Sequence, residues 1–204
     1  MPEWLIGAVL KTARAAKPSG VRIPLPPHLP PHSPPAGHLD VLGLVIQYSI
    51  RHHIGGPIVK WVTRARPKTD RIACPWLIRK FIDPEAEILY VPTDQVLAVA
   101  EQQGAHSFDA PGAEFTHRGA KCSFETLIEE FDLSGDAALM RLARIVHAAD
   151  VSADRDSDPL GVGLEAIGSG GLDVEADDHR LLERAAFVYD ALYAWCARHA
   201  SQPA

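Results

Sequence analysis

The amino-acid sequence predicts an α+β fold: a mostly helical domain with a small sheet of short strands, preceded by a Pro-rich N-terminal arm. Three observations support this prediction. The 204 residues are 47% hydrophobic and 23% charged, which are ordinary values for a globular protein. Residues 18–35 contain eight prolines, which exclude a helix or an inner strand there and favour extended chain. Downstream of this run, helical patterns are interspersed with a few short segments of strand composition.

The most regular helical pattern covers residues 176–198, where Leu181, Ala185, Val188 and Leu192 recur at helical spacing and define a buried stripe. The other expected elements are shorter. Helices are predicted at 40–53, 75–82, 94–103, 123–131, 136–149 and 160–167, and strands at 88–92, 105–110 and 114–117.

The chain divides into an N-terminal extension with a Pro-rich linker, residues 1–59, and a main domain, residues 60–204. The first 20 residues do not have the order of basic and apolar residues that a signal peptide needs. Apolar runs are far shorter than the roughly 20 residues that span a bilayer. Three cysteines are too few for a disulfide scaffold. We therefore expect a cytoplasmic protein with no membrane partner, and the arm's composition indicates contacts in a homo-oligomer.

Charge is distributed unevenly along the chain. Residues 1–82 carry 12 Lys and Arg against 3 Asp and Glu, whereas residues 83–204 carry 8 against 23. Either the basic part docks on the acidic part or lies on solvated faces, or it attracts an anion, such as a small oxyanion, a nucleic acid or an acidic partner. Aromatic residues are not interleaved with the basic cluster, which argues against a nucleic-acid partner.

The basic cluster lies in residues 64–81. If Pro75 opens a helix, Cys74 is its N-cap, and the helix dipole and nearby arginines would stabilise a reactive thiolate. In the alternative, Cys74 is a small buried hydrophobe and the arginines pair with acids of the other half. A helix that starts at Thr69 would place Pro75 inside it and weaken the argument for a thiolate.

Two further segments carry metal-ligand residue types. His117 is followed by Cys122 and Glu125, with Ser123 as a predicted N-cap of the next helix. A carboxylate in a first helical turn is also explained by the helix dipole alone, and the spacing matches no common zinc-finger pattern.

The second segment is His147-Ala-Ala-Asp150, near the end of an apolar helix, where positions i and i+3 share a face. A histidine there is also explained by the dipole at the helix C-terminus. If His117, Glu125, His147 and Asp150 converge, they offer two nitrogen and two oxygen ligands, a set that suits iron, manganese or zinc.

A resemblance to a known family runs through these segments. Residues 60–198 resemble the C-terminal domain of the chromate resistance protein ChrB family. The similar segments, in order, are Trp61–Arg64, Asp70–Pro84, Tyr90–Pro92, His117, Cys122–Phe124, His147–Asp150 and Tyr189–Cys196. The resemblance implies a role in bacterial chromate resistance, usually alongside a chromate efflux transporter. It also implies that the protein acts as a chromate-responsive regulator. The N-terminal region of that family is replaced here by residues 1–59, which puts DNA binding in doubt.

These considerations give one main hypothesis and two rivals. In the main hypothesis the four predicted ligands bind a transition metal, Arg64, Arg71 and Arg79 receive chromate or a similar oxyanion, and Cys74 supplies a redox-active thiolate. In the second, the domain binds or senses chromate without turnover. In the third, the histidines and acids have a structural role and only satisfy one another.

Overall fold

A three-stranded parallel sheet lies at one end of the domain. The computed structural model describes residues 58–200. The predictions for the Pro-rich arm and for a helix at 40–53 lie outside these residues. The strands are β1 (Lys60–Arg64), β2 (Glu87–Val91) and β3 (His106–Ser107), in the order β2-β1-β3. In the centre, Val62 pairs with Leu89 on one side and with Ser107 on the other.

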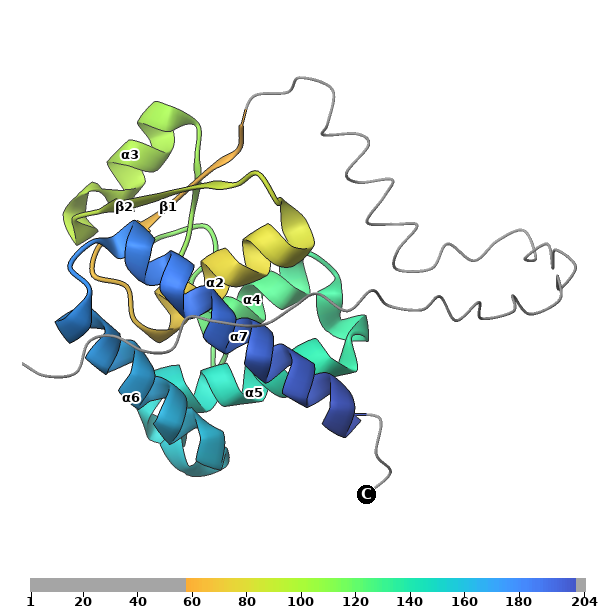
Figure 1. Cartoon of the computed structure of the whole chain (residues 1–204). Coiled ribbons are helices and arrows are strands. Elements are labelled where there is room, and N and C mark those ends of the chain that lie inside the picture. Colours follow the sequence, from red (N-terminus) through yellow and green to blue (C-terminus); the bar gives the residue numbers. More distant parts are fainter. Residues whose placement is uncertain (1–57, 201–204) are drawn as a thin grey trace, which may run out of the picture. The chain divides into compact units, whose positions relative to one another are not determined.

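Helices cover both faces of this sheet (Figure 1). On one face, Val62 packs in a small core with Val96 of α3 (Val96–Gln103). On the other face, Trp61 joins the main core, which the remaining α-helices complete. These helices are α2 (Thr69–Leu77), α4 (Ser123–Glu130), α5 (Ala137–Asp150), α6 (Pro159–Val174) and α7 (Asp178–Ala200). Burial of β1 on both faces is what parallel sheets require.

Short 3₁₀ segments at Leu133–Gly135 and Ser152–Ser157 connect consecutive helices, and a third at Thr93–Gln95 leads from β2 into α3. The domain is thus mostly helical with a small sheet, as predicted. None of the helices within residues 58–200 combines the length and apolar character needed to cross a membrane.

Helix α2 starts at Thr69, not at Pro75, so the predicted N-cap position of Cys74 is wrong. Pro75 lies inside the helix, which continues as a π-helical turn from Ile78 to Ile82. Proline has no N–H to donate to the carbonyl four residues earlier. That carbonyl, of Arg71, instead accepts a hydrogen bond of 3.0 Å from the Tyr90 hydroxyl. Strand β2 thus supplies the partner that the helix loses.

The strand predictions were partly right. The segment 88–92 is confirmed as β2, shifted by one residue. The expected strand 105–110 shrinks to β3, and 114–117 forms only one bridge, between Phe115 and Phe108. The central strand β1 was not predicted, because the basic residues at its ends masked a buried Trp61-Val62-Thr63 core.

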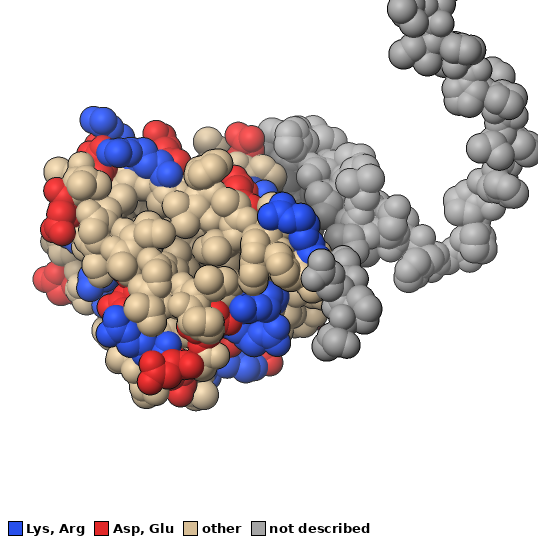
Figure 2. Space-filling view, turned by 60° about the horizontal axis from the view of Figure 1, so that its bottom comes forward, with Lys and Arg blue, Asp and Glu red and all other residues tan. Residues whose placement is uncertain are grey.

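The basic segment docks on the acidic half of the chain. Arg64 and Arg71 pair with Asp109, and Lys80 pairs with Asp190 of α7. The backbone N–H of Arg66 donates to the Asp178 carboxylate over 2.9 Å. On the face shown in Figure 2, Lys and Arg groups lie beside Asp and Glu groups around a broad uncharged area. These contacts fit the first of the two interpretations of the uneven charge, in which the basic part docks on the acidic part.

Candidate functional site

A cluster of acidic side chains lies at the carboxyl ends of β1 and β3. Asp70 is in the first turn of α2, which follows β1, and Asp109 comes two residues after β3. Asp150 is the last residue of α5, and His117 precedes α4. In parallel sheets, ligands commonly bind at the carboxyl ends of the strands, where the strand order reverses. Here that position lies between β1 and β3.

Asp70 is the most deeply buried acid of this cluster, with 1% of the residue exposed. Its Oδ2 accepts a hydrogen bond of 2.7 Å from the backbone N–H of Ser123. Its Oδ1 is buried and has no hydrogen-bond partner. Burial, and next the carboxylates of Asp150 and Asp109, raise the pKa of Asp70 well above its ordinary value. The site therefore holds an incompletely satisfied carboxylate, one of whose two oxygens has no hydrogen-bond partner.

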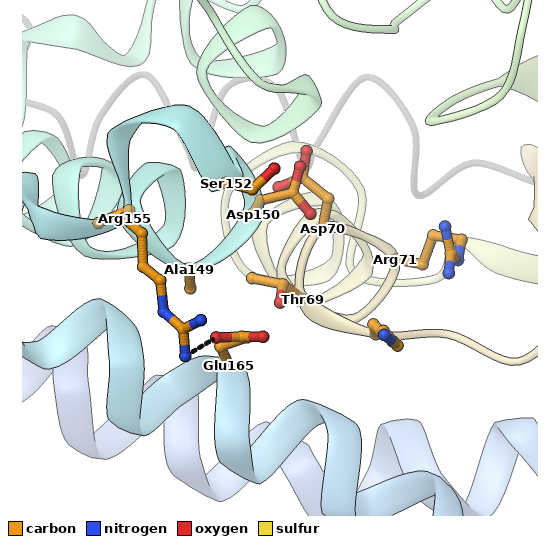
Figure 3. A pocket seen from close by; sticks show the side chains of 10 residues that line it. Thr69, Asp70, Arg71, Ala149, Asp150, Ser152, Arg155 and Glu165 are labelled. Carbon is orange, nitrogen blue, oxygen red and sulfur yellow. Dashed lines mark ion pairs between the residues drawn. The ribbon is translucent and has the colours of Figure 1, made fainter.

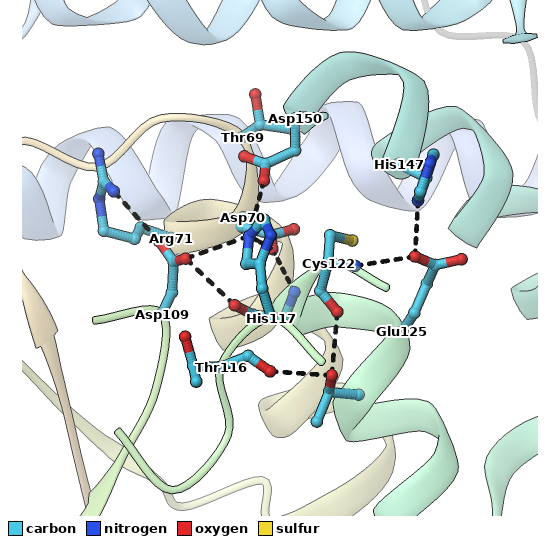
Figure 4. A network of polar contacts seen from close by, with 12 residues as sticks. Thr69, Asp70, Arg71, Asp109, Thr116, His117, Cys122, Glu125, His147 and Asp150 are labelled. Carbon is cyan, nitrogen blue, oxygen red and sulfur yellow. Dashed lines mark hydrogen bonds and ion pairs between the residues drawn. The ribbon is translucent and has the colours of Figure 1, made fainter. Parts of the chain in front are cut away.

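His117 faces this carboxylate group from the surface, with 44% of its side chain exposed (Figure 4). Its Nε2 lies 3.1 Å from Oδ2 of Asp150 and 3.7 Å from Oδ2 of Asp70. Burial, and next Asp109, raise the pKa of Asp150, while His117 opposes this rise. One ligand atom each from Asp70, His117 and Asp150 lie within 4.8 Å of one another. We call these three residues the carboxylate cluster.

Asp109 connects the carboxylate cluster to two arginines. The Arg64 Nη2 and the Arg71 Nη1 lie 2.9 Å and 3.1 Å from its Oδ2, and the Ser123 hydroxyl donates to its Oδ1 over 3.1 Å. The Asp109 backbone is in the left-handed region, with φ of 44°, which is uncommon for a residue other than glycine. Arg64 and Arg71 therefore neutralise an internal carboxylate.

Arg79, the third arginine of the predicted anion site, has a different partner. Its Nε donates to the carbonyl of Ala86 over 3.3 Å, and it lines a groove against α7 with Trp76 and Asp190. The predicted grouping of Arg64, Arg71 and Arg79 around one anion is therefore not the arrangement observed.

A second group of ligand types lies at the start of α4. One ligand atom each from Cys122, Glu125 and His147 are mutually within 4.8 Å. Glu125 Oε2 accepts from the backbone N–H of Cys122 over 3.0 Å and lies 2.7 Å from Nδ1 of His147. Nε2 of His147 lies 3.0 Å from Oδ2 of Asp154. We call Cys122, Glu125 and His147 the thiol cluster.

The four predicted metal ligands thus fall into two clusters, and neither cluster contains all four of them. His117 and Asp150 belong to the carboxylate cluster, whereas Glu125 and His147 belong to the thiol cluster. His147 and Asp150, one turn apart on α5, each serve one cluster. Cys122 is the N-cap of α4, and Ser123, predicted for that position, is the first helical residue.

Cys74 does not have the environment that the sequence predicted. It lies in the interior of α2 and is fully buried. Burial, and next the negative charge of Asp70, raise the pKa of its thiol well above its ordinary value. A reactive thiolate needs the opposite shift, so the arrangement fits the alternative of a small buried hydrophobe.

Asp70, a candidate ligand, and Asp109, which links the carboxylate cluster to two arginines, were both missed by the sequence analysis. Both follow strands of the parallel sheet, so a correct prediction of β1 and β3 would have placed them at its carboxyl edge. Their burial among other acids has no signature in the local sequence, where acids normally indicate exposure.

A pocket of about 210 Å³ opens beside the carboxylate cluster. Asp70, Asp150 and Ser152 line one side, as Figure 3 shows. Lys68 and Arg71 also line it, together with Arg155, which forms an ion pair of 2.7 Å with Glu165. The pocket thus adjoins two residues of the carboxylate cluster, Asp70 and Asp150.

Comparison with known proteins identifies relatives. The family model described as "ChrB, C-terminal domain" matches residues 61–196. A protein named "Protein ChrB" from Cupriavidus metallidurans is 38% identical over 134 residues, which cover 66% of this chain and 40% of that relative. The chain therefore spans less than half the length of that relative. No solved structure matches the chain significantly.

Proposed function

Because the chain belongs to the ChrB C-terminal domain family, we propose that it acts in chromate resistance as a metal-binding domain. The carboxylate cluster of Asp70, His117 and Asp150 would hold a divalent transition-metal ion. The observation that carries this proposal is the orphaned Oδ1 of Asp70, buried among other carboxylates. Such an arrangement is unfavourable without a cation, and metal ligation is one of the few ways that buried charges are stabilised.

The donor set favours manganese or iron as the ion. Carboxylate oxygens suit manganese, and an imidazole nitrogen adds affinity for iron. Asp70 and Asp150 would supply the oxygens and His117 the nitrogen. Ser123 would act behind them, because its N–H fixes the orientation of the Asp70 carboxylate. When bound, the ion would supply positive charge for an anionic ligand in the adjoining pocket.

We propose further that the pocket receives chromate or a similar oxyanion only after the metal has bound. Without the ion, three basic residues that line the pocket, Lys68, Arg71 and Arg155, are balanced by three acidic ones, Asp70, Asp150 and Glu165, so no net positive charge attracts an anion. A divalent ion would make the pocket net positive. Lys68 and Arg71 line the pocket, and the Nε of Arg71 is buried with no hydrogen-bond partner. These groups would contact the anion.

The buried position of Cys74 favours binding or sensing over thiol-based reduction. Incubating the metal-loaded protein with chromate and an electron donor would separate the two functions. We expect stoichiometric binding with no loss of chromate absorbance. Catalytic loss of absorbance would instead establish a reductase.

Metal content is the direct test of the proposal. The purified chain, demetallated and then titrated with Mn²⁺, should bind the ion, as followed by loss of the electron paramagnetic resonance signal of free Mn²⁺. Asp70→Asn and His117→Ala should each lower Mn²⁺ affinity by at least tenfold, whereas Asp94→Asn, at an exposed acid, should not. Unchanged Mn²⁺ binding in both cluster variants would contradict the proposed site.

A chromate titration tests the order of binding. Isothermal titration should detect chromate binding to the Mn²⁺-loaded chain and none to the metal-free chain. Equal binding to both forms would contradict a metal-dependent oxyanion site.

A further inference from the structure

We propose that the thiol cluster is a second cation site, specific for a softer ion of the zinc class. Cys122, Glu125 and His147 offer a sulfur, an oxygen and a nitrogen within 4.8 Å of one another. Structural and catalytic zinc sites use these three donor types, and soft thiolate ligands select zinc over manganese. The proposal does not require that the carboxylate cluster is occupied.

The orientation of His147 supports this assignment. Its Nδ1 points toward Glu125 in the thiol cluster, and its Nε2 lies 3.0 Å from Asp154 on the other side. Histidines that bind metals commonly donate their second ring N–H to a carboxylate, which fixes the tautomer. With Nε2–H donated to Asp154, the Nδ1 lone pair is available to an ion. The alternative is an imidazolium that donates to both carboxylates with no metal.

The polypeptide also holds the other two donors in place. Cys122 and Glu125 form a capping box at the start of α4, in which each side chain accepts from the backbone of the other residue. Cys122 is fully buried, whereas 25% of the Glu125 side chain and 50% of the Asp154 side chain are exposed. An ion would therefore enter from the side of Glu125 and Asp154. Three protein donors leave a fourth position for water or a small ligand, as in catalytic zinc sites.

The two clusters are direct neighbours. His147 and Asp150 are one turn apart on α5, and Ser123, which hydrogen-bonds to Asp70, follows Cys122. The geometry therefore points to a centre with two unlike sites side by side, an oxygen-rich one and a sulfur-containing one. Because the donors differ, the sites should take different metals from a mixture.

Cobalt titration of the demetallated chain tests the thiol cluster. Co²⁺ bound to a cysteine thiolate gives an intense charge-transfer absorption, which nitrogen and oxygen ligands do not give. We expect this band in the wild-type chain and its displacement by Zn²⁺. Cys122→Ser should abolish the band, whereas Cys196→Ser, at a buried cysteine of α7, should retain it. Absence of the band in the folded wild-type chain, or its survival in Cys122→Ser, would overturn the proposal.

Asp70→Asn separates this inference from the proposed function. In that variant the Co²⁺ charge-transfer band should persist while Mn²⁺ affinity falls by at least tenfold. Asp154→Asn should lower Zn²⁺ affinity by about 10- to 100-fold, as changes behind a ligating histidine do. Circular dichroism of each variant establishes that it is folded. If ¹⁵N NMR showed both ring nitrogens of His147 protonated at saturating Zn²⁺, His147 would be an imidazolium that binds no metal, and the proposal would be wrong.

Discussion

Ionisation of the Asp70 side chain opposes folding. Its pKa is raised on folding, chiefly by burial, above the ordinary value of 3.8. Such a group favours the folded state fully at a pH below its unfolded pKa, and this contribution is lost as the pH rises through the folded pKa. In the metal-free chain, stability should therefore fall as the pH rises from about 4 toward neutrality, as far as Asp70 is concerned.

Asp70→Asn should remove this component of the pH dependence. Urea unfolding in the presence of a chelator, at a series of pH values, should show a variant that is less stable than wild type at acid pH and gains on it as the pH rises. The asparagine Oδ1 can still accept from Ser123, so the fold should persist. A constant difference across the pH range would show that Asp70 ionises normally.

The Tyr90 hydroxyl is predicted to stabilise α2 through a single hydrogen bond. Tyr90→Phe leaves the Arg71 carbonyl without its partner, which should cost about 1–3 kcal/mol of unfolding free energy. In a Pro75→Ala background the new N–H can donate to that carbonyl, so the same substitution should cost less. Equilibrium denaturation of the four proteins in this cycle measures the coupling, and additive effects would refute it.

The sequence indicated which residues are candidate metal ligands more reliably than it indicated which of them lie together. His117, Glu125, His147 and Asp150 do lie in two neighbouring clusters of ligand types, because helical spacing and strand ends set their local positions. Their distribution between the clusters depends on how α4 and α5 pack, which local patterns do not encode. The prediction of a reactive thiolate at Cys74 was wrong because the sequence fitted a helix start at Thr69 as well as one at Pro75. The hydrogen bond from the Tyr90 hydroxyl to the Arg71 carbonyl makes a proline inside the helix acceptable.

At the scale of elements, the crossing of α5 and α6 depends on one glycine. A Cβ at Gly161 would lie 2.6 Å from the Ala148 Cβ and 2.9 Å from its carbonyl carbon. Gly161→Ala should therefore destabilise the fold by about 1–3 kcal/mol through overpacking. Because Ala148 lines the pocket, this variant should also weaken anion binding there.

Gly163, on the same helix, is the matched control. A Cβ there meets nothing within 4 Å, so Gly163→Ala should stabilise α6 by about 0.5–1 kcal/mol through helix propensity. Thermal unfolding of the two variants should shift the midpoint in opposite directions. Equal shifts would contradict the close helix contact.

Elements with strong internal patterns were predictable, and those defined by their partners were not. The stripe of apolar residues predicted α7, and Asp136, which accepts from the Leu139 N–H, starts α5 where the pattern begins. Strand β1 has only five residues and basic ends, and it becomes a central strand because β2 and β3 pair with it on both sides.

At the scale of the whole molecule, a bound metal should stabilise the fold. A ligand that binds only the folded state adds about 2.7 kcal/mol at a concentration 100 times its Kd. Differential scanning calorimetry with increasing Mn²⁺ should show a rising midpoint in the wild-type chain. In Asp70→Asn the same Mn²⁺ concentrations should raise the midpoint less, because the affinity is lower. A metal-induced rise of the same size in both proteins would assign the effect to another site.

The position of His147 and Asp150 on one turn of α5 has a thermodynamic consequence. Both clusters draw a ligand from the same rigid element, so fixing that turn in one site fixes a ligand of the other. Any change in zinc affinity caused by manganese must be matched by an equal change in manganese affinity caused by zinc. If both ions bind, occupation of one site would favour occupation of the other, so the domain would respond to the joint presence of the two metals as well as to the amount of either one.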